Sequence, residues 1–247
     1  MHSKFPKFAI ALLKLWALHA KQGTAARLQF VRIALDINGE RVARPFSFVN
    51  APSEPGAEFY GIVVPEGLPS VMVRDVLMKA DALTGDVSVP AEGSVLPDGY
   101  AFERGETRAA VLARMQGAMK RYLAAAWAKR KPTTIAKTPE QAVILASIVE
   151  KETGKPAERR TVAAVYSNRL RLGMPLQADP TVIYPITKGR PLGRRIRQSE
   201  LRAKNGYNTY ASAGLPVGPI ANPGRLSIDA VLDPASTKAL YFVADGT

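Results

Sequence analysis

The chain has 247 residues, of which 47% are hydrophobic and 22% charged, a balance typical of folded globular proteins. Its 34 Lys and Arg against 21 Asp and Glu give a formal net charge of +13, which favours polyanionic partners: nucleic acid, anionic lipid or an acidic cell-wall glycan. Cysteine is absent and the two histidines, His2 and His19, lie near the amino terminus, which argues against a thiolate nucleophile, a Cys- or His-based metal site and a Ser-His-Asp triad. Charge alone does not rank these three, but the basic residues lack regularly interleaved aromatic residues, which disfavours nucleic-acid binding.

The first 58 residues show no membrane anchor or export signal. Phe5 to Ala20 predicts an amphipathic helix, because Lys7 and Lys14 interrupt its apolar residues and it falls short of the roughly 20 that span a bilayer. Leu28 to Ile37 favours a strand, and the turn-forming residues from Asn38 to Glu58 indicate a linker.

A second unit begins at residue 59. The pattern predicts a strand from Phe59 to Val64 and a helix from Ser70 to about Ala80, followed by short extended runs between Val87 and Phe102. A long helix is expected from Thr107 to about Lys129, because its apolar residues recur at helical spacing.

The most clearly delimited helix is expected from Thr138 to Thr153. Thr138 opens a capping box with Pro139 at the first helical position, and Gly154 stands where a glycine often ends a helix. A further helix is predicted from Pro156 to Leu172, ending at Gly173.

From Met174 to Pro223 the chain is rich in proline and loop-forming residues, yet it holds aromatic and apolar side chains that argue against disorder. Long irregular segments of this kind are usually functional, so we interpret this one as the wall of a binding cleft. A short helix near Leu226 to Leu232 and a strand from Leu240 to Val243 complete the pattern. Together the elements predict an α+β fold: a helix-rich domain with short strands and a long loop-rich cleft wall.

Glu152 is the candidate catalytic residue. Leu145, Ile148 and Val149 mark the buried stripe of its helix, and Glu152 follows Ile148 by four positions, so it points toward the core. A carboxyl at the edge of an apolar face has a raised pKa, as a general acid for glycosidic cleavage requires. Alternatively, Glu152 only closes the helix, paired with Lys155 or an arginine.

Glu150 is a secondary candidate. It lies well round the helix from the buried stripe, so a solvated position is expected for it and for Lys151.

Two polar clusters are candidates for substrate binding, because amides, hydroxyls and aromatic rings suit sugar rings and N-acetyl groups. Turn chemistry and loop packing are the alternative interpretation of each residue. The candidates are Gln177, Asp179, Thr181 and Tyr184 around Pro180, and the run Tyr207, Asn208, Thr209 and Tyr210.

Several segments resemble the YceG-like endolytic murein transglycosylases, with similarity from about Gly61 to Thr247. The segments are LASIVEKETG (145–154), AAVYSNRLRLGMPLQADPTVIY (163–184), YNTYASAGLPVGPIANPG (207–224) and LYFVADG (240–246), with VPEGL and LPDGYAF before them. The resemblance implies cleavage inside nascent peptidoglycan strands between N-acetylmuramic acid and N-acetylglucosamine, leaving a 1,6-anhydro end. It implies one catalytic glutamate and neither metal nor cofactor.

The family's glutamate lies in an I-x-E-K-E-T stretch and is carried onto the second acid, Glu152. Glu152 would protonate the glycosidic oxygen and then accept the proton of the muramoyl C6 hydroxyl. The resemblance also implies a location on the outer face of the bacterial cytoplasmic membrane, with glycan strands as substrate and peptidoglycan synthases as candidate partners.

The chain also departs from the family pattern. A membrane helix and a LysM-like subdomain precede the catalytic domain in the family. Here residues 1–58 are interpreted as a partial or degenerate LysM-like α/β region and 59–247 as the catalytic domain, without the family's continuation after the ADG motif. We therefore expect a chain truncated at both ends. A non-catalytic glycan-binding or scaffold protein of wall synthesis stays the alternative function.

Overall fold

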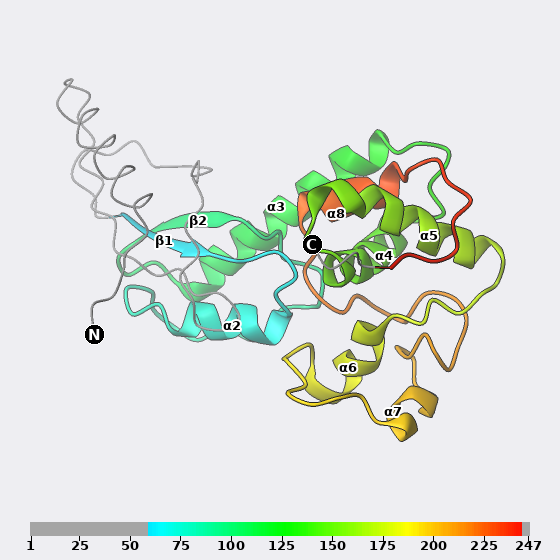
Figure 1. Ribbon diagram of the computed structural model, residues 1–247. Helices are drawn as coiled ribbons and strands as arrows, with labels where there is room; N and C mark the ends of the chain where they lie inside the picture. The colour runs from blue at the N-terminus through cyan, green and yellow to red at the C-terminus, as the bar shows by residue number, and fades with distance from the viewer. Residues whose placement is uncertain (1–58, 244–247) are drawn as a thin grey trace, which may run out of the picture.

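The computed structural model describes residues 59–243 (Figure 1). The helix, strand and LysM-like region predicted within residues 1–58 lie outside this part of the chain, as do both histidines. The described part is helix-rich with one two-stranded sheet, which confirms the predicted α+β class.

A small sheet and one helix form the first part of the structure. Strand β1 (Phe59–Val63) pairs antiparallel with β2 (Gly99–Glu103), and helix α2 (Ser70–Met78) packs beside them around a cluster that includes Ile62, Val73 and Leu77. Of the extended runs predicted between Val87 and Phe102, only β2 is a strand.

Helix α3 (Arg108–Ala128) joins this part to the rest of the molecule, and Figure 1 shows it running between the two. Its first half buries Val111 and Met115 in the sheet cluster, whereas Met119 belongs to a second, larger cluster. The helix was predicted within a residue of its observed limits, because propensity and apolar spacing agree along it.

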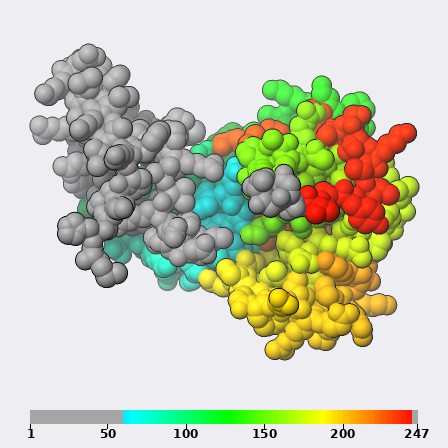
Figure 2. All heavy atoms as spheres, in the orientation of Figure 1, coloured from blue at the N-terminus to red at the C-terminus, as the bar shows by residue number. Residues whose placement is uncertain are grey.

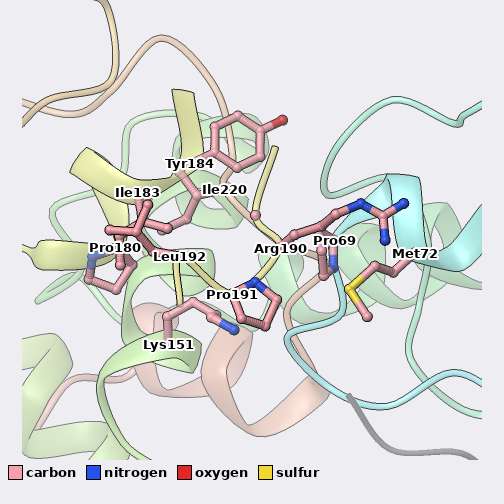
Figure 3. A pocket seen from close by; sticks show the side chains of 11 residues that line it. Pro69, Met72, Lys151, Pro180, Ile183, Tyr184, Arg190, Pro191, Leu192 and Ile220 are labelled. Atoms are coloured by element: carbon pink, nitrogen blue, oxygen red, sulfur yellow. The ribbon is translucent and has the colours of Figure 1, made fainter. Parts of the chain in front are cut away.

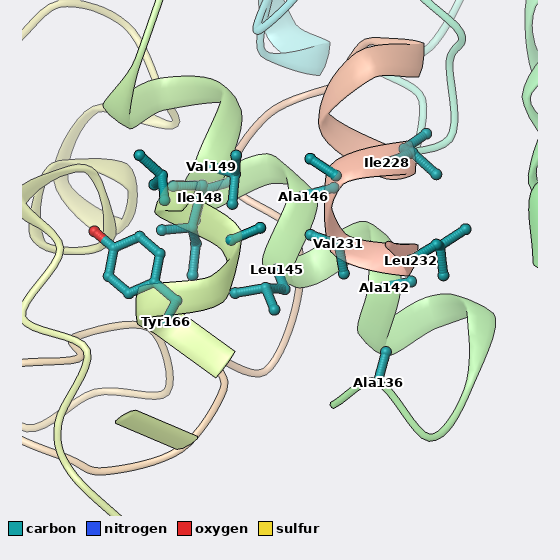
Figure 4. Close-up of a cluster of buried hydrophobic side chains, with 14 of the residues drawn as sticks. Ala136, Ala142, Leu145, Ala146, Ile148, Val149, Tyr166, Ile228, Val231 and Leu232 are labelled. Carbon is teal, nitrogen blue, oxygen red and sulfur yellow. The ribbon is translucent and has the colours of Figure 1, made fainter. Parts of the chain in front are cut away.

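The larger cluster is built mainly by α4 (Pro139–Glu152), α5 (Arg159–Arg171) and α8 (Arg225–Leu232), with a 3-10 turn at Pro156–Glu158 before α5. Leu145, Ile148 and Val149 are fully buried in it, which confirms the predicted stripe. Figure 4 shows these side chains facing α5 and α8.

Both limits of α4 lie within one residue of those predicted, but the glycine cap expected at its end does not form. Thr138 accepts a hydrogen bond from the Gln141 amide at 3.3 Å, with Pro139 at the first helical position. The helix ends at Glu152, because Thr153 is extended (φ −140°) and its hydroxyl donates to Glu158 at 2.7 Å. Gly154 is not left-handed, so the expected glycine cap is absent, whereas Gly173 (φ 67°) does end α5 in this way.

Two short helices, α6 (Asp179–Thr187) and α7 (Gln198–Arg202), interrupt the segment from Met174 to Pro223, where the sequence predicted only loop. Proline at the second position of α6 costs no helical hydrogen bond, because that amide has no partner in the helix. In Figure 1 both helices lie on one side of α4.

The predicted strand from Leu240 to Val243 is wrong. The segment runs beside α5 without a neighbouring strand, and the Leu240 carbonyl accepts a hydrogen bond from the Arg169 side chain at 2.7 Å. In Figure 2 this part of the chain, coloured red, lies on the surface next to the helical unit.

Candidate active site

Glu152 opens into a cavity of about 280 Å³ between α4, α5, the start of α6 and the last described residues. The cavity lies where the buried stripe of α4 reaches the surface, as the periodicity of that helix predicted. Its lining residues are Glu152, Tyr166, Arg169, Leu176, Gln177, Asp179, Tyr210 and Phe242.

The Glu152 carboxyl is a poorly solvated group without a strong partner. Its Oε1 atom is buried, and no donor within residues 59–243 forms a hydrogen bond with it. Burial raises the pKa of Glu152, and the negative charge of Asp179 acts in the same direction; the Tyr166 hydroxyl and the positive charge of Arg169 oppose them. Glu152 therefore holds its proton more tightly than an ordinary glutamate does, which suits a proton donor.

Tyr166 and Arg169 come from α5 and form one side of the cavity. Tyr166 is buried, its ring meets Phe242 edge-on at 5.7 Å, and its hydroxyl points away from the other labelled core side chains in Figure 4. Burial, followed by the charge of Glu152, raises the pKa of Tyr166, so its hydroxyl stays neutral.

Arg169 is held by backbone carbonyls. It donates to Leu176 O at 2.7 Å and to Leu240 O at 2.7 Å, and its guanidinium lies over the Tyr241 ring. No ion pair joins it to Glu152 within the described chain, and Lys155 pairs with Glu158 at 3.7 Å. The pairing considered for Glu152 is therefore not observed.

The sequence interpretation had not singled out Tyr166 and Arg169. A signal was present, because Arg169 follows Tyr166 by three positions on the face of α5 that packs against α4, and a buried arginine needs partners.

Three of the predicted substrate-binding residues line this cavity: Gln177, Asp179 and Tyr210. The Tyr210 hydroxyl donates to Asp179 Oδ1 at 2.6 Å. Gln177 adopts a left-handed backbone conformation (φ 53°), and its backbone amide donates a hydrogen bond to Thr209 O at 3.1 Å. The loop around residue 209 is thereby tied to the start of α6, which places Tyr210 over Asp179.

Three others, Thr181, Asn208 and Thr209, are buried away from the cavity lining. The hydroxyls of Thr181 and Thr209 lie 2.8 Å apart, and Thr209 Oγ1 accepts from the Ala178 amide. The side-chain amide of Asn208 donates hydrogen bonds to three backbone carbonyls in and just after α7. Their contacts are those of turn chemistry and loop packing, the alternative interpretation of these residues.

The last two, Tyr184 and Tyr207, pack on each other with ring centroids 4.8 Å apart. Tyr184 lines a second cavity, of about 310 Å³, on another side of α6, and its hydroxyl donates to Glu92 Oε2 at 3.2 Å. These two tyrosines are therefore not at the Glu152 cavity.

The solvated position expected for Glu150 is wrong. Its side chain is only 5% exposed, and it accepts hydrogen bonds from Arg159 Nη2 at 3.1 Å and the Gly224 amide at 2.9 Å. The same guanidinium reaches Glu66 Oε2 at 3.4 Å and Ser227 Oγ at 3.0 Å. The VPEGL segment and the start of α8 cover this face of α4, which the periodicity of one helix could not reveal. Glu150 is thus held in an ion pair and is not available to a substrate.

Between residues 59 and 243, no group of His, Cys, Asp and Glu side chains is arranged to hold a metal ion. Nor is any helix in that range both long and apolar enough to cross a bilayer.

The YceG-like family profile matches residues 42–247. An endolytic murein transglycosylase from Bacillus subtilis is 33% identical over 177 residues, covering 71% of this chain and 46% of that protein. One from Streptococcus pneumoniae is 31% identical over 161 residues, covering 63% of this chain and 28% of that protein. The chain thus spans less than half the length of these relatives. A crystal structure of a YceG-like protein from Listeria monocytogenes superposes with a TM-score of 0.62 at 26% identity, covering 75% of this chain and 70% of that one. The chain therefore belongs to the YceG-like family.

Proposed function

We propose that this protein is a peptidoglycan lytic transglycosylase in which Glu152 acts first as acid and then as base. The observation that carries the proposal is the half-buried Glu152 carboxyl, which opens into a cavity lined by polar groups and whose Oε1 atom has no hydrogen-bond partner among residues 59–243. The names of the two relatives, both endolytic murein transglycosylases, supply the substrate class and the endolytic mode.

The proposed reaction needs only one carboxyl group. Protonated Glu152 donates its proton to the oxygen between N-acetylmuramic acid and N-acetylglucosamine, and the bond from that oxygen to the muramoyl anomeric carbon breaks. The muramoyl C6 oxygen attacks that carbon and gives its proton to the Glu152 carboxylate, which leaves a 1,6-anhydro end and regenerates the acid. Neither water nor a covalent enzyme intermediate takes part, in contrast to ordinary two-carboxylate hydrolysis.

Tyr166, Arg169 and Asp179 set the conditions for this proton transfer. The neutral Tyr166 hydroxyl and the Arg169 charge stabilise the carboxylate formed midway, whereas burial and Asp179 favour the return of the proton.

We place the activity, by kinship with the relatives, on nascent strands at the outer face of the bacterial cytoplasmic membrane, with peptidoglycan synthases as partners. Labelled protein recovered entirely from the cytoplasm of its host would contradict this location.

The test is digestion of purified peptidoglycan followed by mass spectrometry of the products. Wild-type protein should release 1,6-anhydro ends, and Glu152→Gln should lower their rate by at least about 10²-fold, the usual contribution of a general acid. Glu140→Gln, an exposed change in the first turn of the same helix, is the matched control and should retain activity.

Other products would point to other functions. Hydrated reducing ends would indicate a hydrolase, with Asp179 as the obvious second carboxylate. Glycan binding without any product from the folded protein would indicate the non-catalytic scaffold, and full activity of Glu152→Gln would contradict the assignment of the acid.

A further inference from the structure

The second cavity, of about 310 Å³, differs in character from the one at Glu152. Its walls are mainly apolar, and Figure 3 shows Lys151 and Arg190 among the side chains that line it. The lining residues are Pro69, Met72, Lys151, Pro180, Ile183, Tyr184, Gly189, Arg190, Pro191, Leu192 and Ile220.

The two cavities are neighbours along two elements. At the end of α4, Lys151 lines one and Glu152 the other; at the start of α6, Pro180 lines one and Asp179 the other. A ligand that occupies the Glu152 cavity therefore has a second binding surface within a few residues of the reacting group.

Lys151 is the cation of this second cavity that has no fixed partner. Arg190 is engaged by Asp75, with 2.6 Å between Nη2 and Oδ2. No hydrogen bond or salt bridge joins the Lys151 ammonium to another residue of the described chain, and Glu150 and Glu92 act on it only through longer-range charge. Lys151 is exposed, as the periodicity of α4 predicted, and it lines the cavity, so an anionic ligand can reach its ammonium.

The nearby acidic groups are committed elsewhere. Glu150 is paired with Arg159. Glu92 accepts hydrogen bonds from Ser70, Asn222 and Tyr184, so the Tyr184 hydroxyl is occupied as well. The cavity thus offers a solvent-accessible ammonium beside prolines and aliphatic side chains, and few free groups for a sugar.

We propose that the Lys151 cavity binds the short acidic peptide carried by the glycan strand, with a peptide carboxylate on Lys151 and apolar peptide side chains against the proline-rich wall. This inference rests on the proposed function for its substrate. The chemistry fits because the Lys151 ammonium can form a charge-assisted hydrogen bond with a carboxylate, and small aliphatic side chains gain from burial against apolar walls.

The experiment compares two forms of the same strands, one with its peptides and one from which an amidase has removed them. Binding is measured by calorimetry on the Glu152→Gln protein, so that no cleavage occurs. Strands with peptides should bind about tenfold more tightly, the effect of one charge-assisted contact. In the Glu152→Gln protein, the additional change Lys151→Met should remove this roughly tenfold excess in affinity and leave the affinity for peptide-free strands unchanged.

Lys151→Arg, which keeps the charge, should retain most of the excess, and Lys137→Met is the control for an exposed lysine outside both cavities. An excess that survives Lys151→Met, or equal binding of the two kinds of strand, would overturn the inference. Failure of the proposed function looks different, because wild-type protein would then release no anhydro ends from either kind of strand.

Discussion

Replacing Arg159 tests whether Glu150 is a structural residue. The Arg159 and Glu150 side chains are 6% and 5% exposed, so Arg159→Met leaves a buried carboxylate whose remaining hydrogen-bond donor within residues 59–243 is the backbone amide of Gly224. Removing one partner of such a pair costs about 3–5 kcal/mol. Part of this is recovered, because Arg159 Nη1 already lacks a hydrogen-bond partner in the described structure and an unsatisfied donor costs about 1–3 kcal/mol.

With this relief taken at its lower value of about 1 kcal/mol, the expected net loss is about 2–4 kcal/mol in the free energy of unfolding, or about 4–16 °C in Tm for a domain of this size. Glu150→Gln should cost less, since Glu66 still lies 3.4 Å from the guanidinium. The double variant Glu150→Gln with Arg159→Met should be more stable than the sum of the two single losses predicts, because no unpaired charge stays buried.

Urea denaturation of the wild type, each single variant and the double variant gives the coupling between the two residues. A loss below about 0.5 kcal/mol for Arg159→Met, the usual range for surface changes, would refute the reasoning. So would losses that add, because independent residues show no coupling. Glu150→Gln protein that stays folded should also keep releasing anhydro ends, unlike Glu152→Gln.

Three further outcomes are expected. Cleavage should fall as pH rises through the raised pKa of Glu152. The pH dependence of kcat/KM should place the midpoint of this loss above the ordinary glutamate pKa of 4.5. A midpoint at or below 4.5 would contradict the argument that burial raises the pKa. Tyr166→Phe removes a hydroxyl that favours the carboxylate, so this loss should move to higher pH, whereas an unchanged profile would mean that Tyr166 only packs. Glu152→Gln should raise Tm at neutral pH and change it less in acid. The reason is that a carboxyl whose pKa is raised by folding destabilises the fold once it is ionised, and glutamine cannot ionise. Thermal denaturation at both pH values measures this, and an equal change in Tm at both would count against it.

The sequence predicted best what one helix decides by itself. The limits of α3, the cap at Thr138 and the inward direction of Glu152 follow from periodicity and local hydrogen bonding. The sequence also predicted Gln177, Asp179 and Tyr210 as binding residues, and the structure places all three at the Glu152 cavity. Their roles in binding stay predictions.

What the sequence could not show depends on contacts between distant segments. Glu150 is buried because segments more than seventy residues away, together with VPEGL, close over its face of α4. The strand expected at Leu240 is absent because its carbonyl binds Arg169 rather than a neighbouring strand. Asn208 looked like a sugar ligand, but its amide holds the α7 loop together. No periodicity within one element carries such information.

Helix α3 has a consequence for how the molecule comes apart. Helix α3 carries core residues of both hydrophobic clusters. Unfolding of either cluster would therefore expose apolar side chains of a helix that the other cluster still holds folded. The sheet unit and the helical unit should therefore unfold cooperatively. Differential scanning calorimetry should record one unfolding transition for residues 59–243 rather than two.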